Sequence, residues 1–398
     1  MINIRKIDQL PIAQGSRVFY RVDYNVPLEG TTISDATRIE ETLQTLQYLR
    51  GRGAAIVIAS HLGRPKGTRN AKDSLAPIRA KLSELLGGTN VQWADDCIGA
   101  DAEEKASKLG AGDLLLLENL RFHEGEEKNN AAFAEQLKKL ADYYVNDAFG
   151  ASHRAHASID ALPRLFPKEN TAGGLLLAKE IEFLQKVTNI EERPFVALMG
   201  GAKIAGKIEP LEALVNLADK VLIGGGMANT FLAARGVPMG GSLVDKDSIE
   251  VAQRIMESDH RAEIILPFDL VVADSLEDPK EIDYDADVTD GYTDEEKAFD
   301  IGPKTITNYE AELRDAKLIF WNGPMGEFEK EVFAKGTMAM ARAVANADAV
   351  TVVGGGESVE AIKASGFANK ITHISTGGGA SLEFISGASL PGVEVLRT

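Results

Sequence analysis

The sequence predicts an α/β protein built from two doubly wound, Rossmann-like parallel sheets joined by a helix and hinge. At 398 residues the chain is too long for one ordinary core. Short apolar runs alternate with longer amphipathic stretches along its whole length, which is typical of βα units. Runs such as "AAIVIA" and "DLLLL" are apolar throughout, as expected of strands buried on both faces of a parallel sheet.

In the N-terminal half, the apolar runs lead into charged and polar side chains. The four segments are "VFYRVDYNVP", "AAIVIASHLGRP", "LLLLENLRFH" and "YYVNDAFGASHRAH", the last with a strand at Tyr143 to Val145. Ser74 to Gly87 opens with a capping Ser and ends at Gly, which predicts a helix. A second helix is predicted over "NNAAFAEQLKKLADY", and a third begins near Arg38 after the cap in "SDATRIE".

In the C-terminal half, similar runs lead into glycine: "VALMGGAK", "VLIGGGMA", "TVVGGGES" and "HISTGGGAS". Ligands of such sheets bind beyond the carboxyl ends of the strands, where all these loops are expected. Arginine-lined loops suit a small anion, and glycine-rich loops let backbone N–H groups approach a polyphosphate. We therefore expect two ligands on two domains, brought together for a transfer.

Pro163 to Asn189 is the predicted boundary, because its prolines and Gly173-Gly174 interrupt the pattern. Leu175 to Val187 then reads as one helix joining the halves. The acidic segment from Asp269 to Glu296 approaches an EF-hand spacing. Val288 stands where that loop needs glycine, however, and Asp294 where it needs Glu, so a solvated acidic excursion is expected.

Composition excludes several classes of function. The net charge of −17 argues against non-specific binding to nucleic acid or anionic membranes. No apolar run approaches the roughly 20 residues of a membrane span, and "MINIRKIDQLPIAQG" lacks the apolar core of a signal peptide. The single cysteine, Cys97, fits a reducing compartment. A soluble, cytoplasmic protein is expected.

Lys203 and Lys207 follow a strand in "GGAKIAGKI". Gly201, Gly206 and Lys207 match the phosphate-loop spacing, but Ile208 replaces the hydroxyl that would ligate Mg²⁺, so we reject a Walker motif. The two lysines are one helical turn apart and are expected on the same side. Lysine is slightly disfavoured at a helix start, which favours phosphate contact over a merely exposed position.

The other candidate groups also have ordinary structural readings. Glycine triplets stand at 224–226, 354–356 and 377–379. Each alone could be a tight turn, but three that follow apolar strands favour a nucleotide-binding site. None fits the GxGxxG motif, which argues against a dehydrogenase. His153 and His156 lack further metal ligands, and His123 and His373 are interpreted as structural. Any one arginine is more often an ion-pair partner, but a convergent cluster would need an anion. The cluster comprises Arg21, Arg38, Arg64, Arg121 and Arg154.

Taken together, these segments resemble the phosphoglycerate kinase family from near residue 21 to near residue 384. The specific motifs are "RVDYNVP", "SHLGRP", "ENLRF", "DAFGASHRAHAS", "GGAK", "GGGMANTF", "WNGPMGEFE" and "STGGGASLEF". The resemblance implies reversible phosphoryl transfer between ATP and the carboxylate of 3-phosphoglycerate, in glycolysis and gluconeogenesis. It also implies a 3-phosphoglycerate domain at 1–170, an interdomain helix at 171–187, a nucleotide domain at 188–384, and a segment at 385–398 that returns to the first domain.

The resemblance assigns site residues by motif. The expected 3-phosphoglycerate contacts are Asp23, Asn25, Arg38, His61, Leu62, Gly63, Arg64, Arg121 and Arg154. The expected nucleotide contacts are Lys203, Lys207, Ala298, Asn322, Pro324, Glu329, Gly355, Gly356, Glu357 and Ser358. Arg38, Lys203, Gly377 and Gly378 are expected at the transferring group, with Gly379 lining the transfer zone. Mg²⁺ is expected as MgATP or MgADP, with Glu357 helping to hold it, and a monomer is implied.

Two positions depart from the family pattern. The usual "GGGD" reads "GGGE", so the carboxylate of Glu357 is one methylene further from the backbone and metal preference is in doubt. Ala298 replaces the usual glycine before "DIGP", and its methyl group could tighten the nucleotide pocket or weaken binding.

The implied nucleophile is a carboxylate. With a carboxyl pKa near ~4 it is already ionised at neutral pH, so no general base is needed. Catalysis would rest on positioning and charge neutralisation after domain closure, which also excludes water. A dehydrogenase would need a dinucleotide fingerprint, which the chain lacks. A silent scaffold would be expected to have lost Arg38, Lys203 or the glycine loops, and all are present.

Overall fold

The computed structural model describes residues 2–398. They form two compact units: the first runs to Glu182 and includes Ser389–Thr398, and the second is Phe183–Ala388. The chain passes from one to the other within α7 (Leu175–Thr188), which starts at the predicted residue and ends one residue later. Residues 171–173 belong to a strand, β8, and not to the predicted helical segment 171–187. The prediction of two α/β units with parallel sheets is confirmed.

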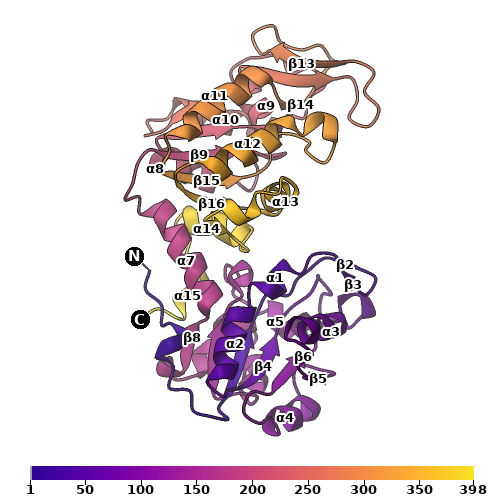
Figure 1. Ribbon diagram of the computed structural model, residues 1–398, viewed down its shortest axis with the longest axis vertical. Helices are drawn as coiled ribbons and strands as arrows, with labels where there is room; N and C mark the ends of the chain where they lie inside the picture. Colours follow the sequence, from indigo (N-terminus) through magenta and orange to yellow (C-terminus); the bar gives the residue numbers. More distant parts are fainter. Residues whose placement is uncertain (1) are drawn as a thin grey trace. The chain divides into compact units, whose positions relative to one another are not determined.

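The first unit is built on a six-stranded parallel sheet of order β5-β6-β4-β1-β7-β8 (Figure 1). Its central strands β1 and β4 run in register, with Val18 opposite Ile56 and Tyr20 opposite Ile58. Side chains on both faces of these strands are buried, as the continuous apolar runs predict. The strands are β1 (Arg17–Arg21), β4 (Ala55–Ala59), β5 (Val91–Ala94), β6 (Leu114–Leu117), β7 (Tyr143–Asn146) and β8 (Thr171–Gly173).

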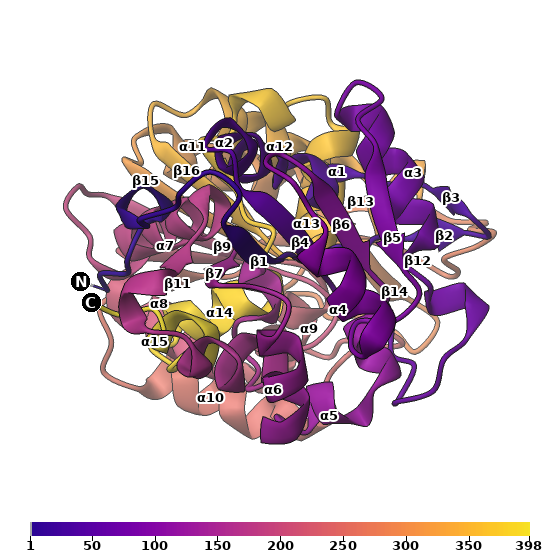
Figure 2. The ribbon, with the colours of Figure 1, turned by 90° about the horizontal axis from the view of Figure 1, so that it is seen from below.

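Helices cover both faces of this sheet (Figure 2). The view shows α2 (Leu43–Gly51) and α3 (Ala76–Leu85) on one side of the strands, and α4 (Ala100–Ser107) and α6 (Ala131–Lys138) on the other. Leu46, Leu49 and Leu82 pack on alternate strand residues, including Tyr20 and Ile58. Each fully buried side chain of this size contributes about 1.5–3 kcal/mol, so truncating Leu46 to Ala is expected to cost about 2–5 kcal/mol of stability.

α3 begins at Ala76, two residues after the predicted capping Ser74. The Ser74 hydroxyl donates to Glu118 at 2.7 Å and accepts from the Ala76 N–H at 3.2 Å, so it joins the helix start to the end of β6. The first unit also contains short elements: the hairpin β2 (Leu28–Glu29) and β3 (Thr32–Ile33), α1 (Thr37–Glu40), α5 (Glu124–Glu127), a 3-10 turn at Leu120–Phe122 and a π-helical turn at Ala157–Ala161.

The end of the chain belongs to the first unit. α15 (Pro391–Glu394) contacts the π-helical turn, and Asn146 Nδ2 donates to the Gly392 carbonyl at 3.3 Å. Arg397 bridges to Ile4 at the beginning of the chain. A side chain at Gly392 would collide with Ser152 at 2.7 Å, so the close approach of this segment requires glycine there.

The second unit has its own six-stranded parallel sheet, of order β11-β10-β9-β15-β16-β17. Trp321 in the central strand is fully buried, and its indole N–H donates to the Gly323 carbonyl at 2.8 Å. The sheet strands are β9 (Phe195–Met199), β10 (Lys220–Ile223), β11 (Glu263–Ile265), β15 (Leu318–Asn322), β16 (Val350–Gly354) and β17 (His373–Ile374). The helices are α8 (Ile208–Leu217), α9 (Gly225–Ala234), α10 (Ile249–Glu257), α11 (Pro303–Arg314), α12 (Lys335–Asn346), α13 (Gly356–Ala364) and α14 (Gly379–Ile385).

The acidic segment is more ordered than predicted. β12 (Asp269–Ala273), β13 (Ile282–Asp287) and β14 (Lys297–Ile301) form a three-stranded antiparallel sheet with β12 in the centre. The exposed acidic residues lie in β13 and in the loops on either side of it, whereas β12 is buried along its whole length. Among residues 2–398, no helix combines the length and apolar character that a membrane span requires.

Candidate functional sites in the two units

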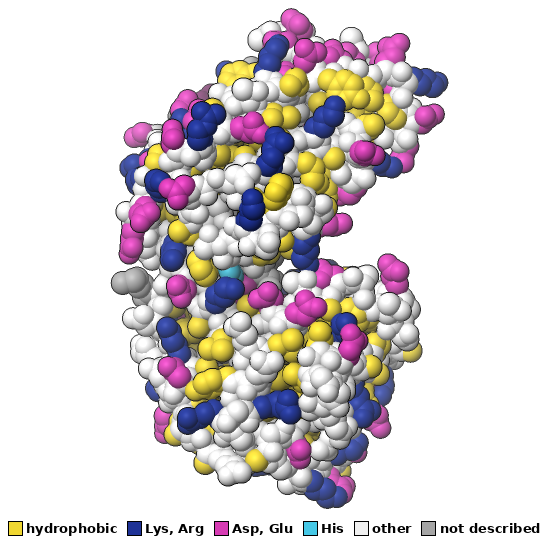
Figure 3. Space-filling view, in the orientation of Figure 1, with side chains coloured by type: hydrophobic (Ala, Val, Ile, Leu, Met, Phe, Trp, Pro, Cys, Tyr) yellow, Lys and Arg dark blue, Asp and Glu magenta, His cyan; other side chains and the backbone are white. Residues whose placement is uncertain are grey.

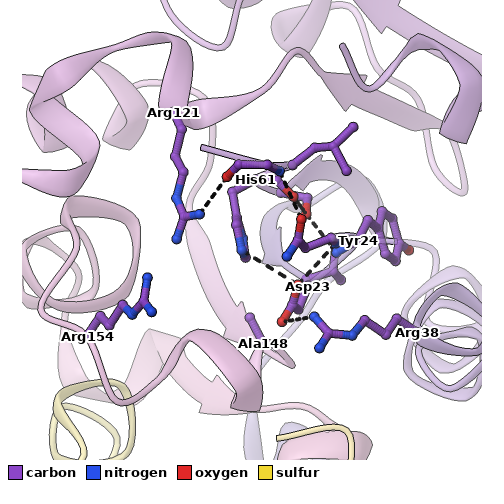
Figure 4. Close-up of polar contacts among 12 residues, drawn as sticks. Asp23, Tyr24, Arg38, His61, Arg121, Ala148 and Arg154 are labelled. Carbon is purple, nitrogen blue, oxygen red and sulfur yellow. Dashed lines mark hydrogen bonds and ion pairs between the residues drawn. The ribbon is translucent and has the colours of Figure 1, made fainter. Parts of the chain in front are cut away.

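In the first unit, Asp23, Arg38 and His61 come together beyond the carboxyl ends of β1 and β4 (Figure 4). Arg38 Nη1 donates to Asp23 Oδ2 at 2.8 Å, and His61 Nε2 lies 3.8 Å from Asp23 Oδ1. Asp35 Oδ1 accepts the Thr37 N–H at 2.8 Å at the start of α1, and Arg38 lies in the first turn of that helix. The prediction that a helix begins near Arg38 is confirmed.

The "SHLGRP" loop is tied to two other predicted residues. The Gly63 N–H donates to Asn25 Oδ1 at 2.9 Å, and Arg121 Nη1 donates to the Gly63 carbonyl at 2.8 Å. Gly63 has φ +63, and an added Cβ would lie 2.3 Å from Asp73 Oδ1, so both conformation and space require glycine. Leu62 is buried and contributes its carbonyl to Asn119 Nδ2 at 2.7 Å. Leu62 therefore supports the loop.

Arg64 and Arg154 are exposed. Arg154 Nε donates to His153 Nε2 at 3.0 Å, and Figure 4 shows its guanidinium group pointing toward the same space as those of Arg38 and Arg121. The structure thus gathers three of the predicted arginines around one opening.

Positively charged groups are in excess around this opening. Burial, and then the Arg21, Arg121 and Arg38 guanidinium groups, hold the pKa of His61 well below its ordinary value. Burial and the charges of Arg121, Arg21 and Arg154 lower the pKa of His156 to about 3. Burial and Arg21 lower the pKa of Arg121 itself to about 10. Both histidines are therefore neutral at physiological pH, and an anion entering the opening would relieve repulsion among the cations.

Arg21 does not belong to the exposed arginine cluster in which the sequence places it. Its side chain is fully buried, with Nε donating to Ser158 Oγ at 2.7 Å and Nη2 3.3 Å from His61 Nδ1. Glu126, also fully buried, accepts from the Ser158 N–H at 2.9 Å and lies 3.7 Å from Arg21. Arg21 therefore supports the site from below and is not one of its open cations. Sequence reasoning missed Glu126, because no apolar run or motif marks a single acid in "HEGEEKNN".

In the second unit, a cavity of about 450 Å³ lies beside the loops that follow β9, β10 and β15. Four predicted nucleotide residues line it: Ala298, Pro324, Glu329 and Glu357. Ser242 Oγ accepts the Ala298 N–H at 2.9 Å, which holds this backbone at the cavity wall. Sequence reasoning recognised "GGGMANTF" as a motif but assigned no site role to Asn229, which also lines the cavity; nor did it find Ser242 or Leu243.

The lysine prediction is partly wrong. Residues 201–206 form a loop, α8 begins only at Ile208, and Lys203 is exposed in the loop, so the two lysines do not share one face of a helix. The cause is the glycines, because Gly201 and Gly206 have φ +94 and +82, which a helix cannot accommodate. Lys207 Nζ donates to the Gly200 carbonyl at 2.9 Å and lies near Glu357, whose charge opposes the lowering of the lysine pKa by burial.

The three glycine triplets differ in what their N–H groups do. At α9, the Gly225 N–H donates to the Met325 carbonyl and the Met227 N–H to the Gly201 carbonyl, so this triplet packs loop against loop. At α13, no hydrogen-bond partner is found within residues 2–398 for the N–H groups of Gly356, Glu357 and Ser358. That helix N-terminus is open to an anion.

Three glycines at the other two triplets face open space. An added Cβ at Gly356, Gly378 or Gly379 would meet nothing within 4 Å. Gly355 has φ +95 and lies against Asn322 Nδ2, 2.7 Å from an added Cβ, so its glycine has an internal cause. Packing inside the protein does not explain Gly356 or Gly379, whereas close approach of a ligand to the backbone would.

Asn322 and Ser358 are buried, and their side chains form hydrogen bonds to the backbone of neighbouring loops. Asn322 Nδ2 donates to the Gly354 carbonyl at 2.8 Å, and Ser358 Oγ accepts from the Gly323 N–H at 2.5 Å. These bonds join the end of β15 to the start of α13. The structure therefore places both as supports beneath the site.

Carboxylates dominate the rim of the cavity. Glu327, Glu329 and Glu357 all line it. Burial and then the charges of Glu329 and Glu357 raise the pKa of Glu327 above its ordinary value. Oxygen ligands of this kind suit a hard divalent cation carried on a nucleotide. Glu327 is a further missed residue, although it stands inside the quoted "WNGPMGEFE".

Comparison with known proteins connects both sites to one family. The family model described as phosphoglycerate kinase matches residues 7–388. The chain is 50% identical over 384 residues to phosphoglycerate kinase of Moorella thermoacetica, covering 96% of each chain. It is 49% identical over 385 residues to that of Leptospira biflexa, again covering 96% of each.

Solved structures agree. The phosphoglycerate kinase of Coxiella burnetii superposes with a TM-score of 0.87 at 35% identity, covering 99% of both chains. That of Pyrococcus horikoshii superposes with a TM-score of 0.86 at 33% identity, covering 99% of this chain and 98% of that one. With two α/β units, an arginine-lined opening in one and a glycine-walled cavity in the other, the chain belongs to the phosphoglycerate kinase family.

Proposed function

We propose that the enzyme catalyses reversible phosphoryl transfer between ATP and the carboxylate of 3-phosphoglycerate, giving ADP and 1,3-bisphosphoglycerate. The first unit holds the acceptor and the second holds the nucleotide. The observation that supports this assignment most strongly is the opposite sign of the two sites. Burial and then neighbouring cations lower the pKa of His61 and His156 in one unit, and burial and then neighbouring carboxylates raise the pKa of Glu327 in the other.

In the acceptor site, the arginines bind and no residue needs to remove a proton. The acceptor carboxylate is ionised at neutral pH, and the lowered pKa of His61 keeps that ring neutral. Asp23 and Asn25 bind the glycerate part, and Arg38 neutralises charge at the transferring group. The 2.8 Å bond to Asp23 holds Arg38 ready for this role. Arg64, Arg121 and Arg154 complete the basic patch. His61 lies within it as a neutral ring, and Leu62 and Gly63 are the backbone contacts of its loop.

In the nucleotide site, backbone N–H groups and carboxylates together bind the ligand. The open N-terminus of α13, at Gly355, Gly356 and Glu357, receives phosphate oxygens, and Lys207 adds a positive charge beside it. Ala298, Pro324 and Glu329 flank the nucleoside, supported by Asn322 and Ser358. Mg²⁺ would enter as MgATP or MgADP, and Glu357 at the cavity rim would help to hold it. It would supply positive charge that offsets the charge of the phosphates.

The transfer itself requires the two ligands to meet. We assign Lys203, Gly377 and Gly378 to the transferring phosphoryl group. Lys203 is exposed and offers charge, and an added Cβ at Gly378 would meet nothing within 4 Å, so a ligand can approach that backbone closely. Gly377 is buried, and its N–H donates to Ser375 Oγ at 3.1 Å. A closing motion would also exclude the water that hydrolyses an acyl phosphate. We place the hinge at Gly173-Gly174 and α7. A Cβ at Gly174 would lie 2.2 Å from Asp147 Oδ1, so this position cannot carry a side chain.

We further infer a cytoplasmic monomer that binds neither nucleic acid nor membranes. The net charge is −17, and on the face drawn in Figure 3 Lys and Arg are interspersed with Asp and Glu over both units. A surface of mixed sign with a net negative charge repels polyanions.

A coupled assay tests the proposed function. ADP formation from MgATP is measured with 3-phosphoglycerate, with 2-phosphoglycerate and without acceptor. Turnover with 3-phosphoglycerate alone is expected. Equal turnover with both acceptors would contradict the assigned acceptor site. No turnover, with nucleotide binding intact by calorimetry, would indicate a silent scaffold and direct attention to Glu357 and Ala298.

A further inference from the structure

A second cluster of chemically versatile side chains lies in the first unit, apart from the acceptor contacts. Asp96 and Cys97 follow β5, in the bend before α4. His123 follows the 3-10 turn that comes after β6. β5 and β6 are adjacent parallel strands, with Ala94 opposite Leu117, so their carboxyl-end loops are neighbours. The topology therefore brings three different ligand types together from two segments.

The three side chains converge at short range. One ligand atom from each, a carboxylate oxygen, a thiol sulfur and a ring nitrogen, all lie within 4.8 Å of one another. His123 Nε2 is 2.6 Å from Asp96 Oδ1. The His123 ring stacks on Phe133 with centroids 5.4 Å apart, and the Cys97 N–H donates to Asp96 Oδ1 at 2.6 Å. These contacts orient the ring and the carboxylate before any ligand arrives.

Burial is graded across the cluster. Cys97 is fully buried, whereas the Asp96 and His123 side chains keep 45% and 29% of their accessible surface. The sulfur thus forms the floor of the cluster and the other two groups its edge. Solvent can reach the open side, which leaves room for a water as a further ligand.

We propose that Asp96, Cys97 and His123 form a binding site for a divalent cation of the Zn²⁺ class. Sulfur with imidazole nitrogen selects Zn²⁺ or Co²⁺ over Mg²⁺, which prefers oxygen ligands alone. Three protein ligands with one open position is the arrangement of an open tetrahedral zinc site. The sulfur and nitrogen ligands distinguish this site from the carboxylates at the rim of the nucleotide cavity.

Little movement is needed to complete the site. Bond lengths of about 2.0–2.3 Å place tetrahedral ligands roughly 3.5 Å apart. His123 Nε2 and Asp96 Oδ1, now 2.6 Å apart, must therefore separate slightly, and the wider spacings of the cluster, which do not exceed 4.8 Å, must shorten. Asp96 and His123 can do this by rotating their partly exposed side chains while Cys97 stays fixed. Binding breaks the Cys97 S–H bond, forms a metal–sulfur bond and releases the proton to solvent.

Co²⁺ is the probe of choice, because thiolate coordination gives a charge-transfer absorption that an oxygen site cannot produce. The full chain is treated with a chelator, desalted and titrated with Co²⁺ without oxygen, and then Zn²⁺ is added to displace it. A band that saturates at one equivalent and disappears with Zn²⁺ is expected. Cys97→Ser should abolish the band, and His123→Gln should weaken Zn²⁺ affinity by about 100-fold or more, since even outer partners of metal ligands contribute about 10–100-fold.

His260→Gln is the matched control, being the same substitution in the other unit, and should leave the band and the affinity unchanged. Asp96→Asn serves if Cys97→Ser does not fold, and it should weaken Zn²⁺ binding while preserving shape. The inference is overturned if the wild-type chain shows no thiolate band. It is equally overturned if His123→Gln and Asp96→Asn bind as tightly as the wild type, because the cluster would then be an ion pair above a buried thiol.

Discussion

The two units offer their ligands opposite electrostatic surroundings. In the first, cations crowd one another, and Arg121, His61 and His156 all lose affinity for protons in part because positive charges surround them. In the second, carboxylates crowd one another, and burial and then the charges of Glu329 and Glu357 raise the pKa of Glu327. This difference fits the proposal that the first unit binds a bare anion and the second an anion that arrives with its own metal.

The two units also differ in which part of the chain is presented. The first uses side chains on charged loops, fixed by bonds such as Arg38 to Asp23 and Arg121 to Gly63. The second uses backbone, with an open helix N-terminus at α13 and glycines that nothing in the protein crowds. Substitutions that remove a charge should therefore impair ligand binding mainly in the first unit. Substitutions that add a methyl group to a glycine should impair it mainly in the second.

The largest effect is expected from Arg38→Ala. Removing a cation at the transferring group should lower kcat by roughly 10³-fold, the scale of an arginine at a phosphoryl transition state, while MgADP binding survives. Steady-state assay and calorimetry measure the two quantities. Arg52→Ala, an exposed arginine at the end of α2, is the control and should keep full activity. Near-normal turnover in Arg38→Ala would remove that residue from the mechanism.

Buried acids give the next largest effect, on stability. Burial raises the pKa of Asp300 in the second unit to about 8 and that of Asp147 in the first to about 6. In both, the folded-state pKa lies above the unfolded value, so their contribution to stability is complete at low pH and is lost as pH rises through the folded pKa. Between pH 6 and 8 the wild type should therefore lose stability relative to Asp300→Asn.

The expected loss is up to about 1.4 kcal/mol per pH unit, or roughly 2–3 kcal/mol in all. Asp147→Asn is the matched control, since its difference from the wild type should already be constant above about pH 6. Urea unfolding of the three proteins at pH 5, 6, 7 and 8 measures this. A gap between wild type and Asp300→Asn that stays constant over pH 6 to 8 would show that Asp300 does not titrate there.

A methyl group at Gly225 tests the backbone site. Gly225 has φ +63, and its Cβ would lie 2.9 Å from the Gly201 nitrogen and 3.0 Å from the Pro324 carbonyl. Gly225→Ala should displace the cavity wall and weaken MgADP binding by about tenfold, equal to about 1.4 kcal/mol. Gly236→Ala shares the positive φ, +86, but has open space, so it should cost about 1 kcal/mol of stability with unchanged affinity. Equal MgADP affinity in the two variants would show that the contact has no role.

The smallest effect is expected at the family departure. Glu357→Asp withdraws the carboxylate by one methylene from a rim that it shares with Glu327 and Glu329. The ratio of kcat/KM with Mg²⁺ to that with Mn²⁺ should change by about two- to fivefold, below 1 kcal/mol. The acceptor KM should not move, because Asp23 and the arginines lie in the other unit. A ratio that stays the same would mean that Glu357 does not approach the metal.

Apolar runs predicted the fold well because burial on both faces leaves a strong pattern. β4 and β6 coincide with "AIVIA" and "LLLL", and α7 starts at the predicted Leu175. Charged side chains after strands also led to the predictions for Asp23 and Arg121, and the cap in "SDATRIE" led to that for Arg38. Local patterns failed where a contact from far along the chain decides the outcome: Arg21 is buried against Ser158, and the β12 strand depends on pairing with β13 and β14.

The lysine error has a local cause. A four-residue spacing indicates one face only where the backbone is helical, and Gly201 and Gly206 prevent a helix before Ile208. Glycine triplets likewise look alike in sequence, yet one packs loops together and another leaves a helix N-terminus open. The difference lies in the carbonyl groups opposite, which the triplet itself does not specify.

The most direct test of the opposed sites is the titration of His156 by NMR, which is practical because the chain has only six histidines. The account predicts that the free protein keeps His156 neutral down to about pH 3, since burial and then Arg121 and Arg21 disfavour its protonation. Adding 3-phosphoglycerate should raise this pKa by neutralising the arginines, and MgADP should leave it unchanged. A free His156 that titrates near its ordinary value, or one that responds to MgADP and not to 3-phosphoglycerate, would contradict the account.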